Sequence, residues 1–275
     1  MIYFMEGTLG SGKTTLAEKY LSSFLKQGTP TILYHEHDRN NPLDLTCRAY
    51  LDKDCFREFK QRLIFAFQRN YGAEWKYANQ KITMSTEPCL DGYIVHLPAL
   101  LNNKKINLEL ELLRDKIISG GDLPIELYLN IFYSRWERFF SNYDSDDTFI
   151  FEGALLQNPL IDLLACYQLK MEELLQIYNQ LLLTIKKYQY SVQYIRVDNV
   201  FSIIKHAARE RQGNIPLWIN SLIQWVENSP HGKKNNLCGF DGVVAFCQTI
   251  DDTAQYLLDN TDFSYTYIER ILPHA

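Results

Sequence analysis

The first 34 residues show two short apolar runs with a helical stripe of apolar side chains between them. Residues 2–5 form the first run, which stops at a glycine loop, and residues 31–34 form the second, which is rich in β-formers. The stripe recurs every three or four positions and ends near Gly28, a natural helix end. Strand, helix and strand in this order predict a βαβ unit with a parallel sheet. The side chains of the stripe are Leu16, Tyr20, Leu21, Phe24 and Leu25.

The pattern changes between residues 40 and 123. Apolar positions at helical spacing predict one helix near the start of this segment and another near its end. Residues 84–98, between the two, contain turn residues and show little clear period. We therefore interpret residues 40–123 as a mostly helical insertion after the second strand. The helical positions are Phe56, Phe59, Leu63 and Phe67 for the first helix, and Leu108, Leu112 and residues 115–118 for the second.

The second half of the chain alternates between helical and strand patterns. This alternation is typical of an α/β fold. The predicted strands are residues 148–151, 191–197 and 265–271. The predicted helices are residues 125–140, residues 171–185, a segment that carries Lys205, and residues 251–258.

Composition and charge narrow the classes of function. The chain has 275 residues, of which 46% are hydrophobic, which is enough for one α/β domain with an insertion. No apolar run approaches the ~18 residues of a membrane span, and no basic leader precedes the first strand, so we expect a cytoplasmic protein without membrane contact. The net charge of −5 disfavours nucleic acid as the main partner. None of the six cysteines forms a C-x-x-C pair, which leaves structural zinc unsupported.

Residues 7–14 carry the most specific chemical signal. They match G-x-x-x-x-G-K-[ST] at every fixed position, after a predicted strand and before a predicted helix. Glycines let backbone N–H groups surround an anion, the lysine reaches the β- and γ-phosphates, and the last hydroxyl ligates Mg²⁺. We therefore expect ATP and Mg²⁺ as cofactors, with Thr14 as a metal ligand. The expected nucleotide-binding residues are Gly7, Gly10, Ser11, Gly12, Lys13, Thr14 and Thr15.

Carboxylates follow the predicted strands at the edge where ligands of open α/β sheets bind. Glu152 comes directly after the third strand, where it can support Mg²⁺ through water or orient the nucleophile. Glu36 and Asp38 follow the second strand, and either can act as the base for an acceptor hydroxyl. The alternative for all three is a solvated surface carboxylate. We expect the neighbouring His35 and His37 to pack or to form hydrogen bonds instead of binding metal.

Basic side chains complete the candidate site. Arg135 borders the apolar stripe of its helix, so we expect it to pair with a substrate phosphate or carboxylate, or with an internal Asp. Arg209 and Arg211, close to Lys205, either close over the transferring phosphoryl oxygens or belong to a solvated basic helix. Lys13 is expected to be exposed in its loop and to add little to the core.

With these residues in view, the chain resembles P-loop kinases of the thymidylate and deoxynucleoside kinase group, and thymidylate-kinase-like bacterial proteins in particular. The resemblance covers most of the chain at low similarity, and the phosphate loop is its one motif that is specific taken alone. The other matching segments are Glu36-His37-Asp38 with Asn41-Pro42, Tyr133-Ser134-Arg135-Trp136-Glu137, and Phe149-Ile150-Phe151-Glu152-Gly153 with Gln157-Asn158-Pro159.

The resemblance implies a P-loop NTPase fold over residues 1–275, with a parallel five-stranded sheet wrapped by helices and the insertion over an acceptor pocket. It also implies that Arg135 contacts the acceptor, that Glu152 supports the metal, and that Arg209 and Arg211 belong to a lid. The chain departs from the group at Glu152-Gly153, where thymidylate kinases have Asp-Arg. The lid is also poorer in arginine and the insertion is long. These departures leave the acceptor open among nucleosides, nucleotides and antibiotic-like metabolites.

The expected function is therefore an ATP-dependent phosphotransferase that acts on a small molecule. The alternative is a regulatory NTPase or nucleotide switch with a protein partner, although no N-K-x-D guanine motif supports a GTPase. A nucleotide-binding protein without turnover is a third hypothesis. A homodimer is compatible with the sequence.

Overall fold

The computed structural model describes residues 1–38, 40–72, 75–97, 100, 113–143, 146–211 and 217–270. Its residues divide into two compact units. The first contains Met1–Glu36 and Asn142–Ala275, and the second contains His37–Ser141. Within the described residues, no helix combines the length and the apolar character needed to span a bilayer.

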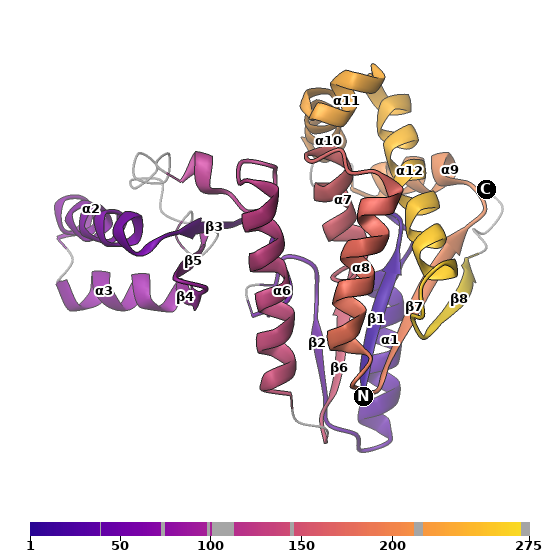
Figure 1. Ribbon diagram of the computed structural model, residues 1–275, viewed down its shortest axis with the longest axis horizontal. Helices are drawn as coiled ribbons and strands as arrows, with labels where there is room; N and C mark the ends of the chain where they lie inside the picture. The colour runs from indigo at the N-terminus through magenta and orange to yellow at the C-terminus, as the bar shows by residue number, and fades with distance from the viewer. Residues whose placement is uncertain are drawn as a thin grey trace. The chain divides into compact units, whose positions relative to one another are not determined.

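The first unit is built on a five-stranded sheet in which every strand pairing is parallel (Figure 1). The strand order is β2-β6-β1-β7-β8. Because all strands run in one direction, their carboxyl ends share one edge of the sheet. The strands are β1 (Ile2–Gly7), β2 (Thr31–Tyr34), β6 (Thr148–Glu152), β7 (Tyr190–Val197) and β8 (Tyr265–Arg270).

Helices cover both faces of this sheet, because alternate strand residues point to opposite sides. On one face, Met5 and Ile150 pack with Ala17 of α1. On the other face, the ring of Phe4 contacts Tyr190, and Tyr190 contacts Phe263. Phe263 in turn contacts Tyr178 of α8. The helices of this unit are α1 (Lys13–Lys26), α7 (Gln157–Ala165), α8 (Met171–Ile185), α9 (Val200–Arg211), α10 (Leu217–Asn228), α11 (Pro230–Asn235) and α12 (Gly239–Asp259).

The predicted α/β class and the parallel five-stranded sheet with flanking helices are confirmed. The predicted strands and the helices with long apolar stripes occur at the expected places, with ends that differ by a few residues. The helix predicted over residues 251–258 is longer than expected, since α12 begins at Gly239. Four of the described helices were not predicted from the pattern: α7, α10 and α11 of this unit and α3 (Trp75–Met84) of the second unit.

The second unit contains helices and a small antiparallel sheet of order β3-β5-β4. The helix predicted around Phe56 is α2, whose apolar side chains pack with the sheet in one core cluster. The elements of this unit are β3 (Arg48–Leu51), α2 (Lys53–Tyr71), α3 (Trp75–Met84), β4 (Thr86–Cys89), β5 (Gly92–His96), the 3₁₀ turn η2 (Arg114–Lys116) and α6 (Ile125–Ser141).

Two expectations about this segment are corrected. Residues 84–98 include the hairpin of β4 and β5, so the insertion contains a sheet as well as helices. The helix expected around residues 115–118 is replaced by η2 and a bridge from Ile117 to Ala49, while Leu108 and Leu112 lie outside the described residues. A strand that pairs with a distant partner is stabilised by that pairing, which the local pattern does not record.

Candidate functional site

The glycine-rich loop, residues 7–14, joins β1 to α1 and depends on its glycines. Gly7, Gly10 and Gly12 have φ values of 141°, 78° and 100°, which side-chain-bearing residues rarely adopt. A Cβ on Gly10 would lie 2.8 Å from Cβ of Ala207 in α9, and one on Gly7 would lie 2.8 Å from Oγ of Ser11. Glycine is therefore required for both the backbone path and the close packing of this loop.

Several polar groups of the loop are available for an anion. The hydroxyls of Thr8 and Ser11 are buried and have no hydrogen-bond partner among the described residues. The first turn of α1 has no side-chain cap at Gly12 and no acidic residue, so its N–H groups and its dipole favour a negative charge. Thr14 and Thr15 are exposed in the same turn. A phosphate chain would satisfy these donors.

The position of Lys13 differs from the expectation. Its side chain is only 5% exposed, and Nζ donates to the carbonyl of Thr8 at 3.3 Å. The expectation that Lys13 is exposed in the loop is therefore wrong. The ammonium group of Lys13 can be buried within the loop because the carbonyl oxygen of Thr8 replaces water as its hydrogen-bond acceptor.

Glu152 links the end of β6 to the start of α1. Its Oε1 accepts a hydrogen bond from the hydroxyl of Thr14, and its Oε2 lies 3.0 Å from Nδ1 of His35. Glu152 is 4% exposed, so this carboxylate is oriented by two partners in a largely desolvated place. The structure thus brings together Thr14 and Glu152, the two residues predicted as metal ligands. Within the described residues, no group of three or more His, Cys, Asp or Glu side chains forms a ready metal site.

Glu36 lies two residues after the end of the neighbouring strand, β2. Its Oε1 accepts a hydrogen bond from Nε2 of Gln157, at the start of α7. Gly153, with φ of 66°, leaves the space that Glu36 occupies, because a Cβ at this position would lie 2.6 Å from Oε1 of Glu36. The absence of a side chain at Gly153 therefore makes room for a carboxylate.

Glu6, the last residue before the glycine-rich loop, is a site residue that the sequence did not predict. Glu6 is fully buried and accepts backbone hydrogen bonds from Leu155 at 2.7 Å and from Gln157 at 3.0 Å. Burial raises its pKa to about 7, although these N–H groups and the charge of Lys13 act in the opposite direction. In the sequence, Glu6 is a single acidic residue after an apolar run, and this pattern is equally typical of a solvated carboxylate at the end of a strand.

Asp38, the other candidate base, is used in a turn. Its Oδ1 accepts from the backbone N–H of Asn40 at 2.9 Å. The extended backbone ends at Tyr34, and His37 has φ of 62°, so the strand alternation that would align Asp38 with Glu36 does not continue. His37 itself contacts the hydroxyl of Thr46 at 2.8 Å.

Arg135 lies on α6 in the second unit, where its charge is paired. It is 6% exposed, its Nη1 donates to Glu87, and its Nη2 donates to the carbonyl of Asn41 at 3.3 Å. Burial acts to raise the pKa of Glu87, but the hydrogen bond from His96 and the charge of Arg135 lower it to about 2. A second buried arginine, Arg48, borders this group and has its pKa lowered to about 10 by burial and by Arg135. Contact of Arg135 with an acceptor stays a prediction.

The predicted lid arginines lie in the last turn of α9. Arg209 and Arg211 are both exposed, and the guanidinium of Arg211 stacks over Trp218 at 4.3 Å. Arg211 follows Ala207 by four residues, so it lies on the side of the helix that packs against Gly10. Of the two arginines, Arg211 is therefore better placed to approach the loop.

Arg270, at the end of β8, is a further cation beside the loop. Its Nη1 donates to the carbonyl of Gly10, and a Cβ on Gly12 would lie 3.1 Å from the same nitrogen. No sequence motif pointed to this residue, because its approach depends on β8 being the edge strand next to β7.

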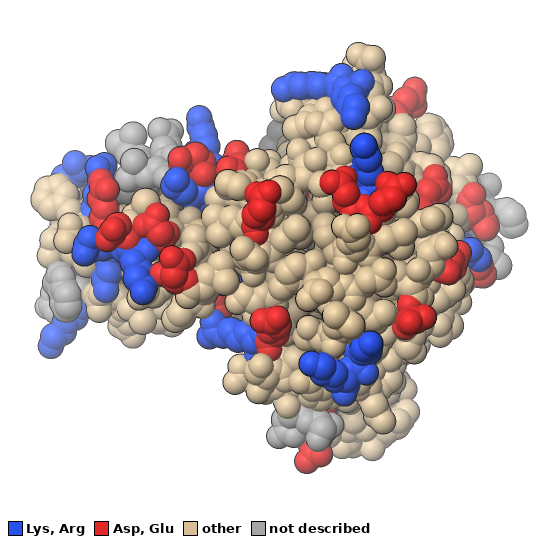
Figure 2. All heavy atoms as spheres, in the orientation of Figure 1, with Lys and Arg blue, Asp and Glu red and all other residues tan. Residues whose placement is uncertain are grey.

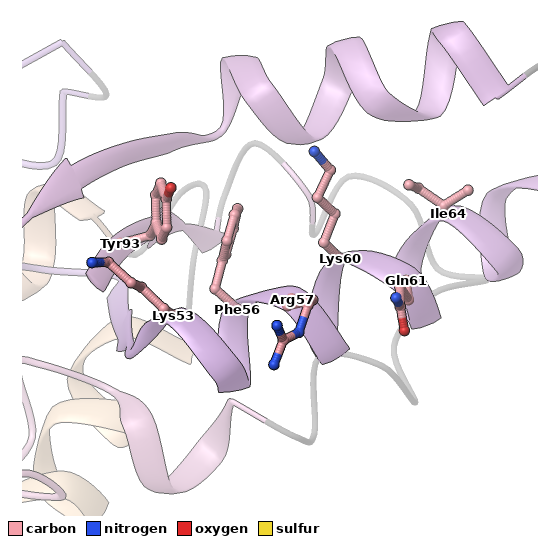
Figure 3. Close-up of a pocket in the computed structure, with 7 residues that line it drawn as sticks. All are labelled: Lys53, Phe56, Arg57, Lys60, Gln61, Ile64 and Tyr93. Carbon is pink, nitrogen blue, oxygen red and sulfur yellow. The ribbon is translucent and has the colours of Figure 1, made fainter. Parts of the chain in front are cut away.

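The second unit also carries a cavity of about 520 Å³ on α2 and β5. Figure 3 shows Phe56 and Tyr93 side by side. The centroids of the two rings are 4.0 Å apart. Arg57, which also lines the cavity, is paired with Asp54 at 2.6 Å. None of the site residues predicted from the sequence lines this cavity.

Charged side chains are mixed over the face shown in Figure 2, where lysines and arginines alternate with acids instead of forming one basic surface. Comparisons of the chain with protein-family models and with curated proteins give no match. The assignment of function therefore rests on the motif and on the geometry of the sheet edge.

Proposed function

We propose that this chain is an ATP-dependent phosphotransferase that transfers the γ-phosphoryl group to a hydroxyl of a small molecule. The observation that carries the proposal is the hydrogen bond between Thr14 and Glu152. It joins the hydroxyl that the G-x-x-x-x-G-K-[ST] motif assigns to Mg²⁺ with the acid at the end of the adjacent strand. A motif that arose by chance would have no reason to be completed in this way.

The loop residues fit a triphosphate. Positive φ values at Gly7, Gly10 and Gly12 support a phosphate-binding loop, and the unpartnered hydroxyl of Ser11 supplies a donor there. The ammonium group of Lys13 is already directed into the loop through the carbonyl of Thr8, which a phosphate oxygen can replace as its acceptor. These features support the P-loop NTPase fold implied by the resemblance.

Thr14 and Glu152 are the residues that would hold Mg²⁺, Thr14 through its hydroxyl and Glu152 through water. The ion, when bound, neutralises charge on the phosphate oxygens. His35 contacts the second oxygen of Glu152 and so limits the rotation of this carboxylate. Both oxygens of Glu152 are therefore held by Thr14 and His35, so Glu152 would serve the metal and the nucleotide instead of the acceptor.

Glu36 is then the best candidate for the base. It lies at the end of the strand next to β6, and its carboxylate is not part of the Thr14–Glu152 pair. It would hold the acceptor hydroxyl and take its proton on a carboxylate oxygen as the bond from the acceptor oxygen to the γ-phosphorus forms and the bond from the γ-phosphorus to the β,γ-bridging oxygen breaks, which releases ADP. Asp38 is the weaker candidate, because its side chain closes a turn.

The remaining roles follow the resemblance. Arg135 would contact an anionic group of the acceptor, and Arg211, with Arg209, would close over the transferring phosphoryl oxygens. The acceptor is a nucleoside, a nucleotide or an antibiotic-like metabolite.

The test is transfer of label from γ-labelled ATP to a panel of nucleosides, nucleoside monophosphates and aminoglycosides. Labelled product from one class is the expected result. A protein that binds MgATP and releases only inorganic phosphate with every acceptor supports the nucleotide switch instead. A protein that does not bind MgATP in calorimetry refutes both functions.

A further inference from the structure

Gln157 is a buried polar residue at the same sheet edge that no motif assigns a role. It is 3% exposed and begins α7. Its Nε2 donates to Oε1 of Glu36, and the same nitrogen lies 3.2 Å from Oδ1 of Asn158. The amide therefore connects the first turn of α7 to the carboxylate that we assign as the base.

The backbone of Gln157 is held as firmly as its side chain. Its N–H donates to Oε2 of Glu6 at 3.0 Å, and the N–H of Leu155 donates to Oε1 of the same carboxylate at 2.7 Å. Glu6 is fully buried at the end of β1, one residue before the glycine-rich loop. Glu6, Gln157 and Glu36 thus form a chain of contacts that starts beside the loop and reaches the end of β2.

The orientation of the Gln157 amide is decided by Glu36. Its carbonyl oxygen, Oε1, is buried without a hydrogen-bond partner among the described residues, which is unfavourable for a polar atom. A reversed amide would place this oxygen against the carboxylate of Glu36, where two acceptors would meet and a donor would be lost. Gly153, which lacks a side chain, leaves the room in which Glu36 approaches this amide.

We propose that Gln157 is a positioning residue for phosphoryl transfer, which holds the carboxylate of Glu36 in the orientation that receives the acceptor proton. Glu6 fixes the backbone of Gln157 by accepting the hydrogen bond from its N–H group. The inference rests on the proposed function, in which Glu36 is the base. It predicts that Gln157 affects the rate of transfer only through Glu36.

A double-mutant cycle on the full chain tests this inference, with water as the acceptor and ATP hydrolysis as the assay. Gln157→Met keeps the size of the side chain and removes its donor. It should lower kcat about tenfold, a part of the ~10²-fold or greater loss expected for Glu36→Gln, with KM for ATP nearly unchanged. In the Glu36→Gln background, Gln157→Met should produce no further loss, because the group it positions is already gone.

Gln193→Met is the matched control. Gln193 is a similarly buried glutamine on β7, bound to the hydroxyls of Tyr20 and Ser191, and it should leave kcat unchanged. Gln157→Glu gives a second variant if Gln157→Met does not fold, and it should lower kcat at least as much because it places an acceptor against Glu36.

The outcomes distinguish failure of the positioning role from failure of the proposed function. Losses that multiply in the double variant, or full activity of Gln157→Met in a folded protein, overturn the positioning role and leave the proposed function intact. An active wild-type protein whose kcat is unaffected by Glu36→Gln overturns the base assignment on which the inference rests. A wild-type protein that neither binds nor hydrolyses ATP refutes the proposed function itself.

Discussion

Replacing Gly153 with alanine should displace the carboxylate of Glu36 and leave most of the site in place. Gly153 follows Glu152 at the end of β6 and has φ of 66°. The added methyl group would lie 2.6 Å from Oε1 of Glu36, whereas ordinary contact begins at 3.4 Å. The carboxylate must therefore shift, because contacts to a Cβ atom shorter than 3.0 Å essentially never occur, and a return to ordinary contact takes a displacement approaching ~1 Å.

This substitution should reduce activity far more than stability. An alanine in the left-handed conformation costs ~1–2 kcal/mol, which lowers Tm by ~2–8 °C for a unit of this size. The displacement itself adds little to this cost, because Oε1 is the far end of a flexible side chain. Catalysis is more sensitive, since a reacting group that is misplaced by about 1 Å loses ~10²-fold in rate.

Gly28→Ala is the control that separates the two effects. Gly28 has φ of 74°, and a Cβ at this position would meet nothing within 4 Å. Gly28→Ala should therefore show a similar loss in Tm by scanning calorimetry and no loss in kcat for ATP hydrolysis. If both variants have the same kcat as the wild-type protein, Glu36 is not the base in the position that the structure gives it. If both lose activity equally, the loss comes from backbone strain and the reasoning about Glu36 is refuted.

Three further predictions concern other parts of the chain. Lys13→Ala should abolish tight binding of an ATP analogue in calorimetry, and unchanged affinity together with unchanged turnover would remove the P-loop assignment. Arg135→Lys, which keeps the charge and loses the planar fork, should raise KM for the acceptor more than KM for ATP, and equal effects on both would contradict the acceptor role. The raised pKa of Glu6, about 7 against a usual 4.5, means that its contribution to stability is complete below pH 4.5 and is lost as the pH rises through about 7. Urea unfolding at about pH 5 and about pH 8 should show a lower free energy of unfolding at the higher pH in the wild-type protein, and a smaller decrease in Glu6→Gln. An equal decrease in the two proteins would refute this prediction.

Local patterns predicted the elements that are stabilised within themselves. The apolar stripe of α8, over residues 171–185, and the spacing of the glycines in residues 7–14 both depend on residues only a few positions apart in the sequence. Such features repeat with the period of the element and can be read without knowledge of the fold. The order of strands and helices likewise predicted the parallel sheet and the edge at which Glu36 and Glu152 lie.

The tertiary structure decided what depends on partners far apart in the chain. The hairpin of β4 and β5 exists because β5 also pairs with β3, and the burial of Lys13 follows from the path of the whole loop. The contacts of Gln157 with Glu36 and with Glu6 join residues that are 121 and 151 positions apart. They form only because β6 lies between β1 and β2 in the sheet, and strand order is set by how the complete chain packs its apolar faces. The sequence by itself therefore determined the glycine-rich motif of residues 7–14 and the class of fold, whereas the packing of three neighbouring strands determined which carboxylate each polar partner holds.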